Sequence, residues 1–270
     1  MTEPLASLDS ASIVAEATAI AELTDFGAYA FTEPMEKLLE ALEAEADLSP
    51  VGRIIQRQRV VDILVNNLRL VDYLKRYPAI LEETIHAPLV IVGLPRTGTT
   101  MLHRTIASDA RMFAPKWYET RNPSPFPGWD LSAKDPRITE AEAQVRAMLE
   151  GNPELASIHP MDALAPDEEI MLLEHSFYSY MPESAADIPS FGGWLDQQDH
   201  TPGYEFLKVQ LQFLQWQKKR LGQDGERWLL KAPHHLHFMD LFHKLCVPIK
   251  WLDIVWKKQD VKTLLATMIH

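Results

Sequence analysis

The first 80 residues place hydrophobic and polar positions with the period of amphipathic helices. We expect one helix from a Ser10 cap to about Ala30, and a second from Thr32, with acids in its early turns as the helix dipole favours. Ser49-Pro50 predicts the start of a third helix, because proline is tolerated in the first turn, and Tyr77-Pro78 predicts its end. The apolar face of this third helix comprises Ile54, Val61, Leu64, Leu68 and Val71.

The pattern changes after residue 80. Pro88–Gly93 is a short, continuous apolar run rich in β-branched residues, which is typical of a buried strand in a parallel sheet. Arg227–Lys231 and Ile249–Val255 show the same pattern, and helical periodicity follows each of them, from about His234 and about Val261. Strands that alternate with helices predict an α/β fold, with a parallel sheet of about four or five strands and helices on both faces.

The chain divides into two predicted parts. Residues 1–80 form a helical N-terminal extension, and residues 81–270 form the α/β domain. Inside that domain, residues 115–222 hold a proline-rich loop and three expected helices, near 137–150, 167–180 and 203–220. We interpret this stretch as an insertion over the sheet edge, where enzymes commonly build the wall or lid of a substrate site.

Composition excludes several classes. The chain has 270 residues, 46% of them hydrophobic, which is enough for a full core. No apolar run approaches the roughly 20 residues that cross a bilayer, and the N-terminus lacks the basic and apolar regions of a signal peptide. The single cysteine, Cys246, cannot form an internal disulfide. We therefore expect a cytoplasmic protein without a membrane span.

The charge is unevenly spread. The formal net charge is −12, and residues 1–50 hold 11 acids against one base, Lys37. The remainder of the chain is close to neutral, so it has no broad basic face for nucleic acid. We expect the acidic segment to be a solvated helical face.

One loop carries the sharpest chemical signal. Gly93-Leu-Pro-Arg-Thr-Gly-Thr-Thr100 lies between an expected strand and an expected helix, where backbone N–H groups and a helix N-terminus hold an anion. The spacing from Gly93 to Gly98 is that of a Walker A loop, but Thr99 stands where a nucleotide hydrolase has lysine. This difference argues against ATP or GTP hydrolysis. Arg96 places a cation inside the loop instead.

Residues 90–109 resemble the 5′-phosphosulfate loop of sulfotransferases that use 3′-phosphoadenylyl sulfate (PAPS). They are most similar to the bacterial branch related to tyrosylprotein sulfotransferases, and the likeness continues through residues 115–123, 158–169 and 228–236. The resemblance implies a P-loop-like α/β fold and PAPS as the donor. It also implies a small-molecule or peptide acceptor with a hydroxyl or amine. We expect no obligatory metal, because a sulfuryl group carries less charge than a phosphoryl group.

Sulfuryl transfer needs cations and N–H donors where the phosphate leaves, and a base where the acceptor loses its proton. Lys231 is a second candidate cation, because it ends an apolar strand at the edge where parallel sheets bind ligands. In the enzymes that the chain resembles, a lysine in a similar position touches the sulfate. The candidates for donor binding in the loop are Arg96, Thr97, Gly98, Thr99, Thr100 and Met101.

Glu119 is the first candidate for the base. It lies 23 residues beyond Arg96, and the related enzymes carry a catalytic glutamate at a similar distance. A surface salt bridge with Arg121 or Lys116 is the alternative for this residue.

Histidines supply two further candidates for the base. His159 precedes a proline in a loop and can accept a proton at neutral pH, although it can equally be a packed or acceptor-site residue. His234 follows Lys231 at a spacing close to the Lys-x-His of cytosolic sulfotransferases. A metal site at His234, His235 and His237 is disfavoured, because a helix start explains this run.

Three consecutive acids, Asp167-Glu168-Glu169, also suggest a carboxylate site. We interpret them as the acids that a helix N-terminus prefers, since they follow a proline and precede an expected helix.

The C-terminal segment departs from the family pattern. Members usually follow the strand at Ile249–Val255 with a His-Arg-Asp-Pro-like turn, and the Arg, with a Ser about eight residues later, holds the 3′-phosphate. Here Lys258 and Ala266 fall at those positions, and the chain ends at His270, where relatives continue. We therefore expect weakened 3′-phosphate recognition, low activity, and uncovered apolar surface that allows a homo-oligomer. The alternatives to a sulfotransferase are a small-molecule kinase and a catalytically inactive nucleotide-binding or interaction protein.

Overall fold

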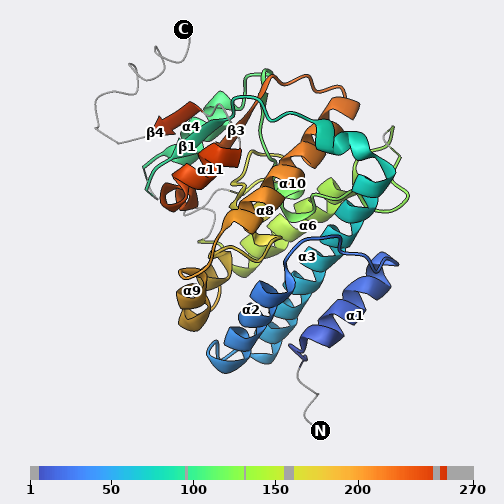
Figure 1. The fold of residues 1–270 in the computed structure, drawn as a ribbon, viewed down its shortest axis with the longest axis vertical. Coiled ribbons are helices and arrows are strands. Elements are labelled where there is room, and N and C mark those ends of the chain that lie inside the picture. The colour runs from blue at the N-terminus through green and yellow to red at the C-terminus, as the bar shows by residue number, and fades with distance from the viewer. Residues whose placement is uncertain (1–5, 95–96, 131, 155–160, 246–249, 254–270) are drawn as a thin grey trace.

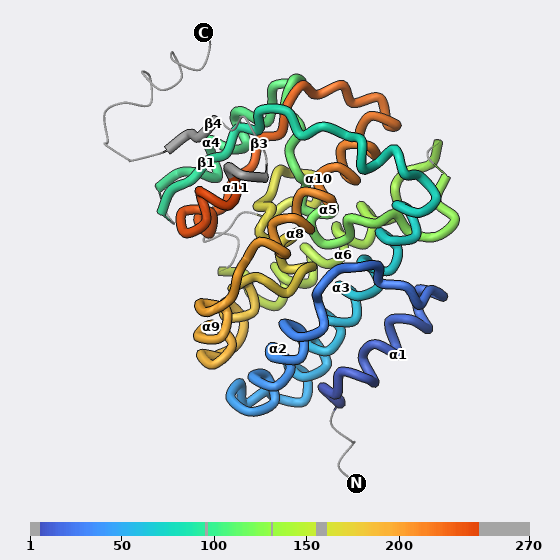
Figure 2. Tube along the Cα trace, in the orientation of Figure 1, coloured from blue at the N-terminus to red at the C-terminus, as the bar shows by residue number. Residues whose placement is uncertain are grey.

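The computed structural model of the chain describes residues 6–94, 97–130, 132–154, 161–245 and 250–253. Three N-terminal helices lie at one end of the molecule and a small sheet lies at the other (Figure 1). The helix α10 (Thr201–Arg220) passes between them, as the trace in Figure 2 also shows. Its side chains pack on the sheet through Leu207 and Leu211, and on the N-terminal helices through Phe206 and Phe213.

The sheet is parallel, as the sequence predicts. Its described strands are β1 (Leu89–Val92), β2 (Met112–Phe113), β3 (Arg227–Lys231) and β4 (Lys250–Asp253), in the order β2-β3-β1-β4. All three strand pairs run parallel, and Ile91 of β1 lies opposite Lys231 of β3. The expected strands β1, β3 and β4 are confirmed, whereas β2 is too short for a sequence pattern to reveal.

Both faces of the sheet are covered, which explains the continuous apolar runs of its strands. Leu89, Ile91 and Leu229 face the helix α4 (Thr99–Ile106) and pack against Leu102 and Ile106. The alternate residues Val90, Val92 and Leu230 face α10. The prediction of helices on both faces is confirmed.

Local capping signals set the N-terminal helices. The helix α1 (Ser10–Ala21) is capped by Asp9, whose carboxylate accepts from the N–H of Ser12 at 2.8 Å, so the cap is one residue earlier than expected. The helix also ends well before Ala30, because Glu22 adopts a left-handed conformation with φ 55°. The helices α2 (Thr32–Ala44) and α3 (Pro50–Arg76) match their predictions, and Ser49 caps α3 through the N–H of Gly52.

The N-terminal helices share their hydrophobic core with part of the insertion. The apolar face of α3 is buried at four of its five predicted positions, whereas Ile54 is 58% exposed. Helices α1, α2 and α9 (Pro189–Leu195) pack in the same core, together with the residues just before the short helix η2 (Met181–Ser184). The residues contributed by the insertion are Phe177, Tyr178, Ile188, Phe191 and Leu195.

The insertion is helical in part. The predicted helices near 137–150 and 203–220 are confirmed by α6 (Pro136–Gly151) and α10. The helix expected over 167–180 is wrong: α8 covers only Ile170–Glu174, and Phe177 turns the chain with φ 64°. Unpredicted short helices are α5 (Trp117–Arg121), η1 (Pro78–Glu82) and α9.

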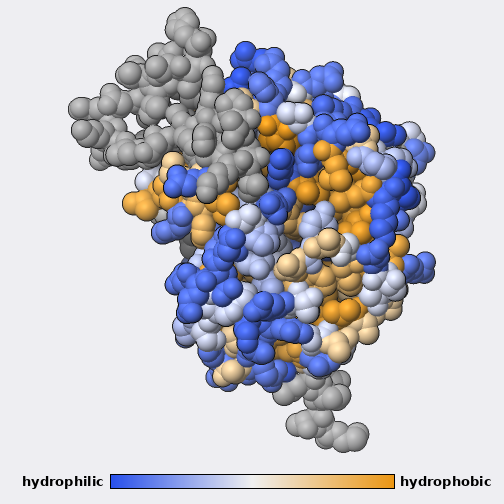
Figure 3. Space-filling view, viewed as in Figure 1, coloured by the Kyte–Doolittle hydropathy of each residue, from blue (hydrophilic) through white to orange (hydrophobic). Residues whose placement is uncertain are grey.

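After β3 the chain forms η3 (Pro233–His237) and α11 (Met239–Leu245), in agreement with the helical pattern from His234. The helix expected from Val261 lies outside the described residues. On the face shown in Figure 3, hydrophobic side chains gather to the right of the middle, and hydrophilic ones lie along the right edge and at the lower left. None of the helices in the described ranges is long and apolar enough to traverse a bilayer.

Candidate active site

The glycine loop leads from β1 into α4 through a left-handed residue. Gly98 has φ 88°, a conformation that residues with a Cβ disfavour, and its carbonyl accepts from the N–H of Leu102 at 3.1 Å. The Thr97 hydroxyl donates to the carbonyl of Leu94 at 2.7 Å and closes the turn. The first N–H groups of α4 have no acceptor within the helix, so the loop presents them for an anion.

The predicted loop residues differ in what they expose. Thr99 is buried, whereas the side chain of Met101 projects into solvent at 71% exposure, so Met101 can contribute only its backbone. Arg96 lies outside the described residues, and its role stays a prediction.

Lys231 brings a buried cation to this loop. It is the last residue of β3 and lies beside β1, the strand from which the loop leaves. Its Nζ atom is 3.3 Å from Oγ1 of Thr100, in the first turn of α4, and forms an ion pair with Oε1 of Glu168. The lysine side chain is only 3% exposed. The structure thus brings together two residues, Thr100 and Lys231, that the sequence predicts separately.

Glu168 reaches Lys231 because two distant segments pair. The N–H of Trp117 donates to the carbonyl of Ala165 at 3.0 Å, and the N–H of Asp167 donates to the carbonyl of Pro115 at 2.9 Å. This pairing places the acids just before α8 at the ends of β1 and β3. The acids lie at a helix start, as the sequence predicts, and Glu169 is the N-cap residue of α8. That position does not explain their carboxylates, because no side chain caps α8 and Glu168 and Glu169 bind Lys231 instead.

The pKa values of the two neighbouring glutamates are shifted in opposite directions. Burial raises the pKa of Glu168, and attraction to Lys231 offsets only part of that effect. Burial acts in the same direction on Glu169, but hydrogen bonds from His235 and from the N–H of Lys231 outweigh it and lower the pKa of Glu169. Glu168 is the more accessible of the two, because 22% of its side chain is exposed, whereas Glu169 is fully buried.

Glu169 begins a chain of buried hydrogen bonds. Its Oε2 atom accepts from the backbone N–H of Lys231 at 2.8 Å, and its Oε1 atom lies 2.6 Å from Nε2 of His235. The other ring nitrogen of His235, Nδ1, lies 2.8 Å from the Tyr204 hydroxyl. All four residues are buried. They come from the α8 segment, β3, η3 and α10.

Glu119, the first predicted base, lies in a different environment. Its two carboxylate oxygens are 2.6 and 2.7 Å from Nζ of Lys218, and its Oε2 also accepts from the N–H of Lys116 at 2.8 Å. Both side chains of the Glu119–Lys218 pair are almost completely buried. The alternative of a surface salt bridge is therefore wrong, because the partner is a core lysine on α10. Glu119 as base stays a prediction, with its carboxylate already committed to a cation.

Of the remaining predicted site residues, His234 is buried and the others lie outside the described residues. His234 is buried against Tyr180 and Phe238, and burial, assisted by repulsion from His235, lowers its pKa to about 3. His159, Lys258 and Ala266 lie outside the described residues. Within the described ranges, no group of three His, Cys, Asp or Glu side chains is arranged to hold a metal ion.

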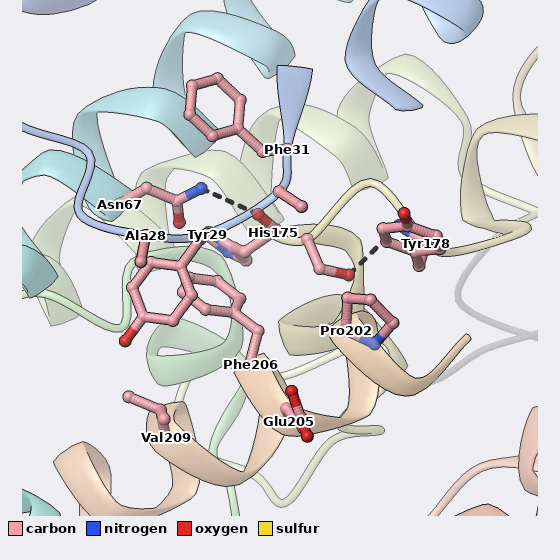
Figure 4. Close-up of a pocket in the computed structure, with 12 residues that line it drawn as sticks. Ala28, Tyr29, Phe31, Asn67, His175, Tyr178, Pro202, Glu205, Phe206 and Val209 are labelled. Carbon is pink, nitrogen blue, oxygen red and sulfur yellow. Dashed lines mark hydrogen bonds between the residues drawn. The ribbon is translucent and has the colours of Figure 1, made fainter. Parts of the chain in front are cut away.

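A separate cavity lies on the side of the N-terminal helices (Figure 4). Its volume is about 430 Å³, and its walls include the aromatic side chains of Tyr29, Phe31, Tyr178 and Phe206. It shares no lining residue with the group formed by Thr100, Glu168 and Lys231. We therefore assign it no part in the chemistry of that group.

A parallel sheet whose glycine loop opens a helix beside a buried lysine is the arrangement of a P-loop-like α/β fold. The model of a family described as the sulfotransferase family matches residues 88–248, which is more than half of the chain. The chain belongs to the sulfotransferase family.

Two solved structures are similar over most of the chain. Sulfotransferase STF1 from Mycobacterium tuberculosis H37Rv is 29% identical with a TM-score of 0.77, and the match covers 96% of this chain and 70% of STF1. Sulfotransferase STF9 from Mycobacterium avium is 21% identical with a TM-score of 0.78, covering 92% of this chain and 62% of STF9. The chain thus spans less than two thirds of STF9, and that likeness shows the fold. A comparison with curated proteins finds no match.

Sequence reasoning missed the roles of four residues. Glu168 and Glu169 carried a signal, the run of acids after Pro166, but the same run suits a helix start. In the sequence, His235 is only one member of a histidine run. Tyr204 gave no signal, because it reads as an ordinary apolar-face residue of α10.

Proposed function

We propose that this chain transfers a sulfuryl group from PAPS to a hydroxyl or amine of a small-molecule or peptide acceptor. The observation that carries the proposal is the contact of Lys231 with Thr100 at the first turn of α4, in a member of the sulfotransferase family. A buried ammonium, a threonine hydroxyl and open helix N–H groups fit the doubly charged 5′-phosphate side of the donor. PAPS, when bound, supplies the activated sulfuryl group.

Lys231, Thr100 and the α4 N–H groups have one task in this reaction. They hold the negative charge that gathers on the leaving 5′-phosphate oxygen as its bond to sulfur breaks and the acceptor's bond to sulfur forms. Because Lys231 is buried, water screens its charge less than it would at the surface. The missing Walker lysine is consistent with this assignment, since the cation comes from β3 instead of from the loop helix.

For the base we propose Glu168. Its carboxylate is partly open to solvent and lies against Lys231, so an acceptor placed over the sulfuryl group would meet it. The pKa raised by burial suits a group that must take a proton near neutral pH. Glu169 is fully engaged with His235 and the Lys231 N–H, and Glu119 is engaged with Lys218.

The Glu168→Gln variant tests this assignment. We expect turnover to fall about 10²- to 10⁴-fold, the usual contribution of a general base, with the affinity for adenosine 3′,5′-bisphosphate (PAP) nearly unchanged. The wild-type rate should fall on acidification, at a higher pH than an ordinary glutamate would give, because the pKa of Glu168 is raised. The measurement is the pH–rate profile with labelled PAPS. If Glu168→Gln keeps its activity while a Glu119→Gln protein that is still folded and still binds PAP loses it, the base is Glu119.

A thermal-shift measurement tests the donor. We expect PAP to raise the melting temperature and ATP to leave it unchanged, because a ligand that binds only the folded state stabilises it. Stabilisation by ATP with Mg²⁺ would favour the kinase, and stabilisation by neither nucleotide would favour the inactive binding protein. A screen of phenols, sterols, peptides and sugars with labelled PAPS would then identify the acceptor.

The affinity for PAP tests the predicted weakness at the 3′-phosphate. Lysine offers a point charge where the family uses a bidentate arginine, so we expect binding weaker than micromolar if Lys258 and Ala266 occupy that subsite. Calorimetric titration measures this constant directly. Submicromolar binding would contradict the prediction. Sedimentation of the same sample tests the predicted homo-oligomer.

A further inference from the structure

We propose that Glu169, His235 and Tyr204 form a positioning relay that holds Lys231 in place for sulfuryl transfer. The relay is the chain of hydrogen bonds from the Tyr204 hydroxyl through the His235 ring and the Glu169 carboxylate to the Lys231 N–H. The inference rests on the proposed function, because it assigns the relay to the cation of that reaction. Its members are positioning residues, since they act through Lys231.

The end of β3 needs such a support. The neighbouring strand β2 ends where Phe113 lies opposite Trp228, three residues before Lys231. Within the described residues, the N–H of Lys231 binds the carboxylate of Glu169 and so replaces the missing strand partner. A buried N–H without a partner would cost stability and leave the end of the strand free to shift.

The relay also fixes the second partner of Lys231. Glu168 and Glu169 are consecutive, so anchoring Glu169 restricts the backbone that carries Glu168. Glu169 binds the main chain of Lys231, and Glu168 binds its ammonium group. One short segment therefore sets both the position of the strand end and the direction of the lysine side chain.

The hydrogen-bond partners of the relay determine which atoms carry hydrogens. The pKa of Glu169 is lowered, so Glu169 is a carboxylate that accepts at both oxygens, from the Lys231 N–H at one and from the His235 ring at the other. Nε2 of His235 must therefore carry a hydrogen. Nδ1 then accepts from the Tyr204 O–H, and a neutral ring with its hydrogen on Nε2 satisfies every member of the chain.

A substitution at Tyr204 can remove one hydrogen bond of the relay without leaving a cavity in the core. Its ring packs against Phe238 and Phe242 with centroids 5.7 Å apart in both pairs, and Tyr204→Phe removes only the hydroxyl. Tyr180→Phe is the matched control, because it removes a tyrosine hydroxyl that binds Asp196, outside the relay. His235→Gln identifies the ring signals of His235 and interrupts the relay at its centre.

The first experiment is nuclear magnetic resonance of the full chain labelled with ¹⁵N. We expect the wild-type His235 ring to be neutral at pH 7, with the hydrogen on Nε2, and the Lys231 amide to shift in Tyr204→Phe but not in Tyr180→Phe. A wild-type ring with its hydrogen on Nδ1, or equal Lys231 shifts in the two variants, would overturn the relay.

The second experiment separates positioning from folding. In Tyr204→Phe we expect turnover of PAPS to fall about tenfold, since a small displacement of a charge-stabilising group is costly, with the PAP dissociation constant within about threefold of wild type. The control Tyr180→Phe should keep both constants. Unchanged turnover in Tyr204→Phe, with PAP still bound, overturns only the relay. Failure of PAP to bind the wild type would instead refute the proposed donor.

Discussion

At the scale of single residues, burial and partners decide function more than residue type does. Glu119, Glu168 and Glu169 are chemically identical, yet one is neutralised by a core lysine, one faces the candidate reaction centre, and one supports a strand end. The environments of Glu168 and Glu169 shift their pKa values in opposite directions. Separated pKa values of adjacent acids are typical of acid–base sites.

The Glu119→Gln variant should lower the stability of the protein. It leaves the Lys218 ammonium buried without its carboxylate, and breaking a buried pair costs about 3–5 kcal/mol. Urea unfolding measures the loss. Glu40→Gln is the matched control, because Glu40 pairs with Lys37 at the surface, where both side chains are exposed, and such a pair contributes less than about 1 kcal/mol. Equal losses in the two variants would contradict the distinction.

At the scale of elements, short-range signals were reliable where they lay next to the element they control. Ser49-Pro50 correctly predicted the start of α3, and the Gly93–Thr100 loop correctly predicted a strand before it and a helix after it. The signals failed where a tertiary contact bends the chain. The helix expected over 167–180 stops after one turn and a half, since Phe177 turns its side chain into the core with the N-terminal helices.

The Gly98→Ala variant tests the loop geometry. A Cβ at φ 88° costs roughly 1–2 kcal/mol, and the strain should tilt the first N–H groups of α4 away from the phosphate site. We expect a lower melting temperature and a lower affinity for PAP, measured by calorimetric titration.

Gly151→Ala provides the comparison for Gly98. Gly151 is the last residue of α6, and a Cβ there meets no atom within 4 Å. This substitution should be neutral or slightly stabilising, because alanine restricts the unfolded chain. A Gly98→Ala protein as stable and as PAP-competent as Gly151→Ala would show that the left-handed turn is not required.

At the scale of the whole molecule, α10 joins the two ends of the protein. One face of the helix packs on the sheet and another packs on the N-terminal helices, and it also carries Lys218 and Tyr204 to their partners. The end with the sheet and the end with the N-terminal helices are therefore linked by one continuous element, as Figure 1 shows. The core of the N-terminal helices is likewise completed by residues of the insertion.

Buried histidines should make the whole protein sensitive to acid. Burial lowers the pKa of His103 and His175 to about 4 and that of His234 to about 3, from an ordinary value of 6.5. On acidification the unfolded chain gains these protons first. The contribution of these neutral histidines to the free energy of unfolding is therefore fully present above pH 6.5. It is lost as the pH falls towards 4, at about 1.4 kcal/mol per pH unit for each histidine.

Urea unfolding at several pH values measures this slope. His103→Gln should reduce the slope of the unfolding free energy against pH by the contribution of one histidine. His86→Gln, at an exposed position, should leave that slope unchanged. The same slope in both variants would show that His103 does not contribute.

The sequence by itself determined the local features of this protein: the starts of α2 and α3, the end of α3, the buried strands, the glycine loop and the family they indicate. These follow from interactions within a few residues, which periodicity and turn chemistry express directly. Only the tertiary structure decided which charges meet. Glu119 pairs with Lys218 across 99 positions and Glu168 pairs with Lys231 across 63, because chain packing, which no local pattern records, sets which buried groups must satisfy one another.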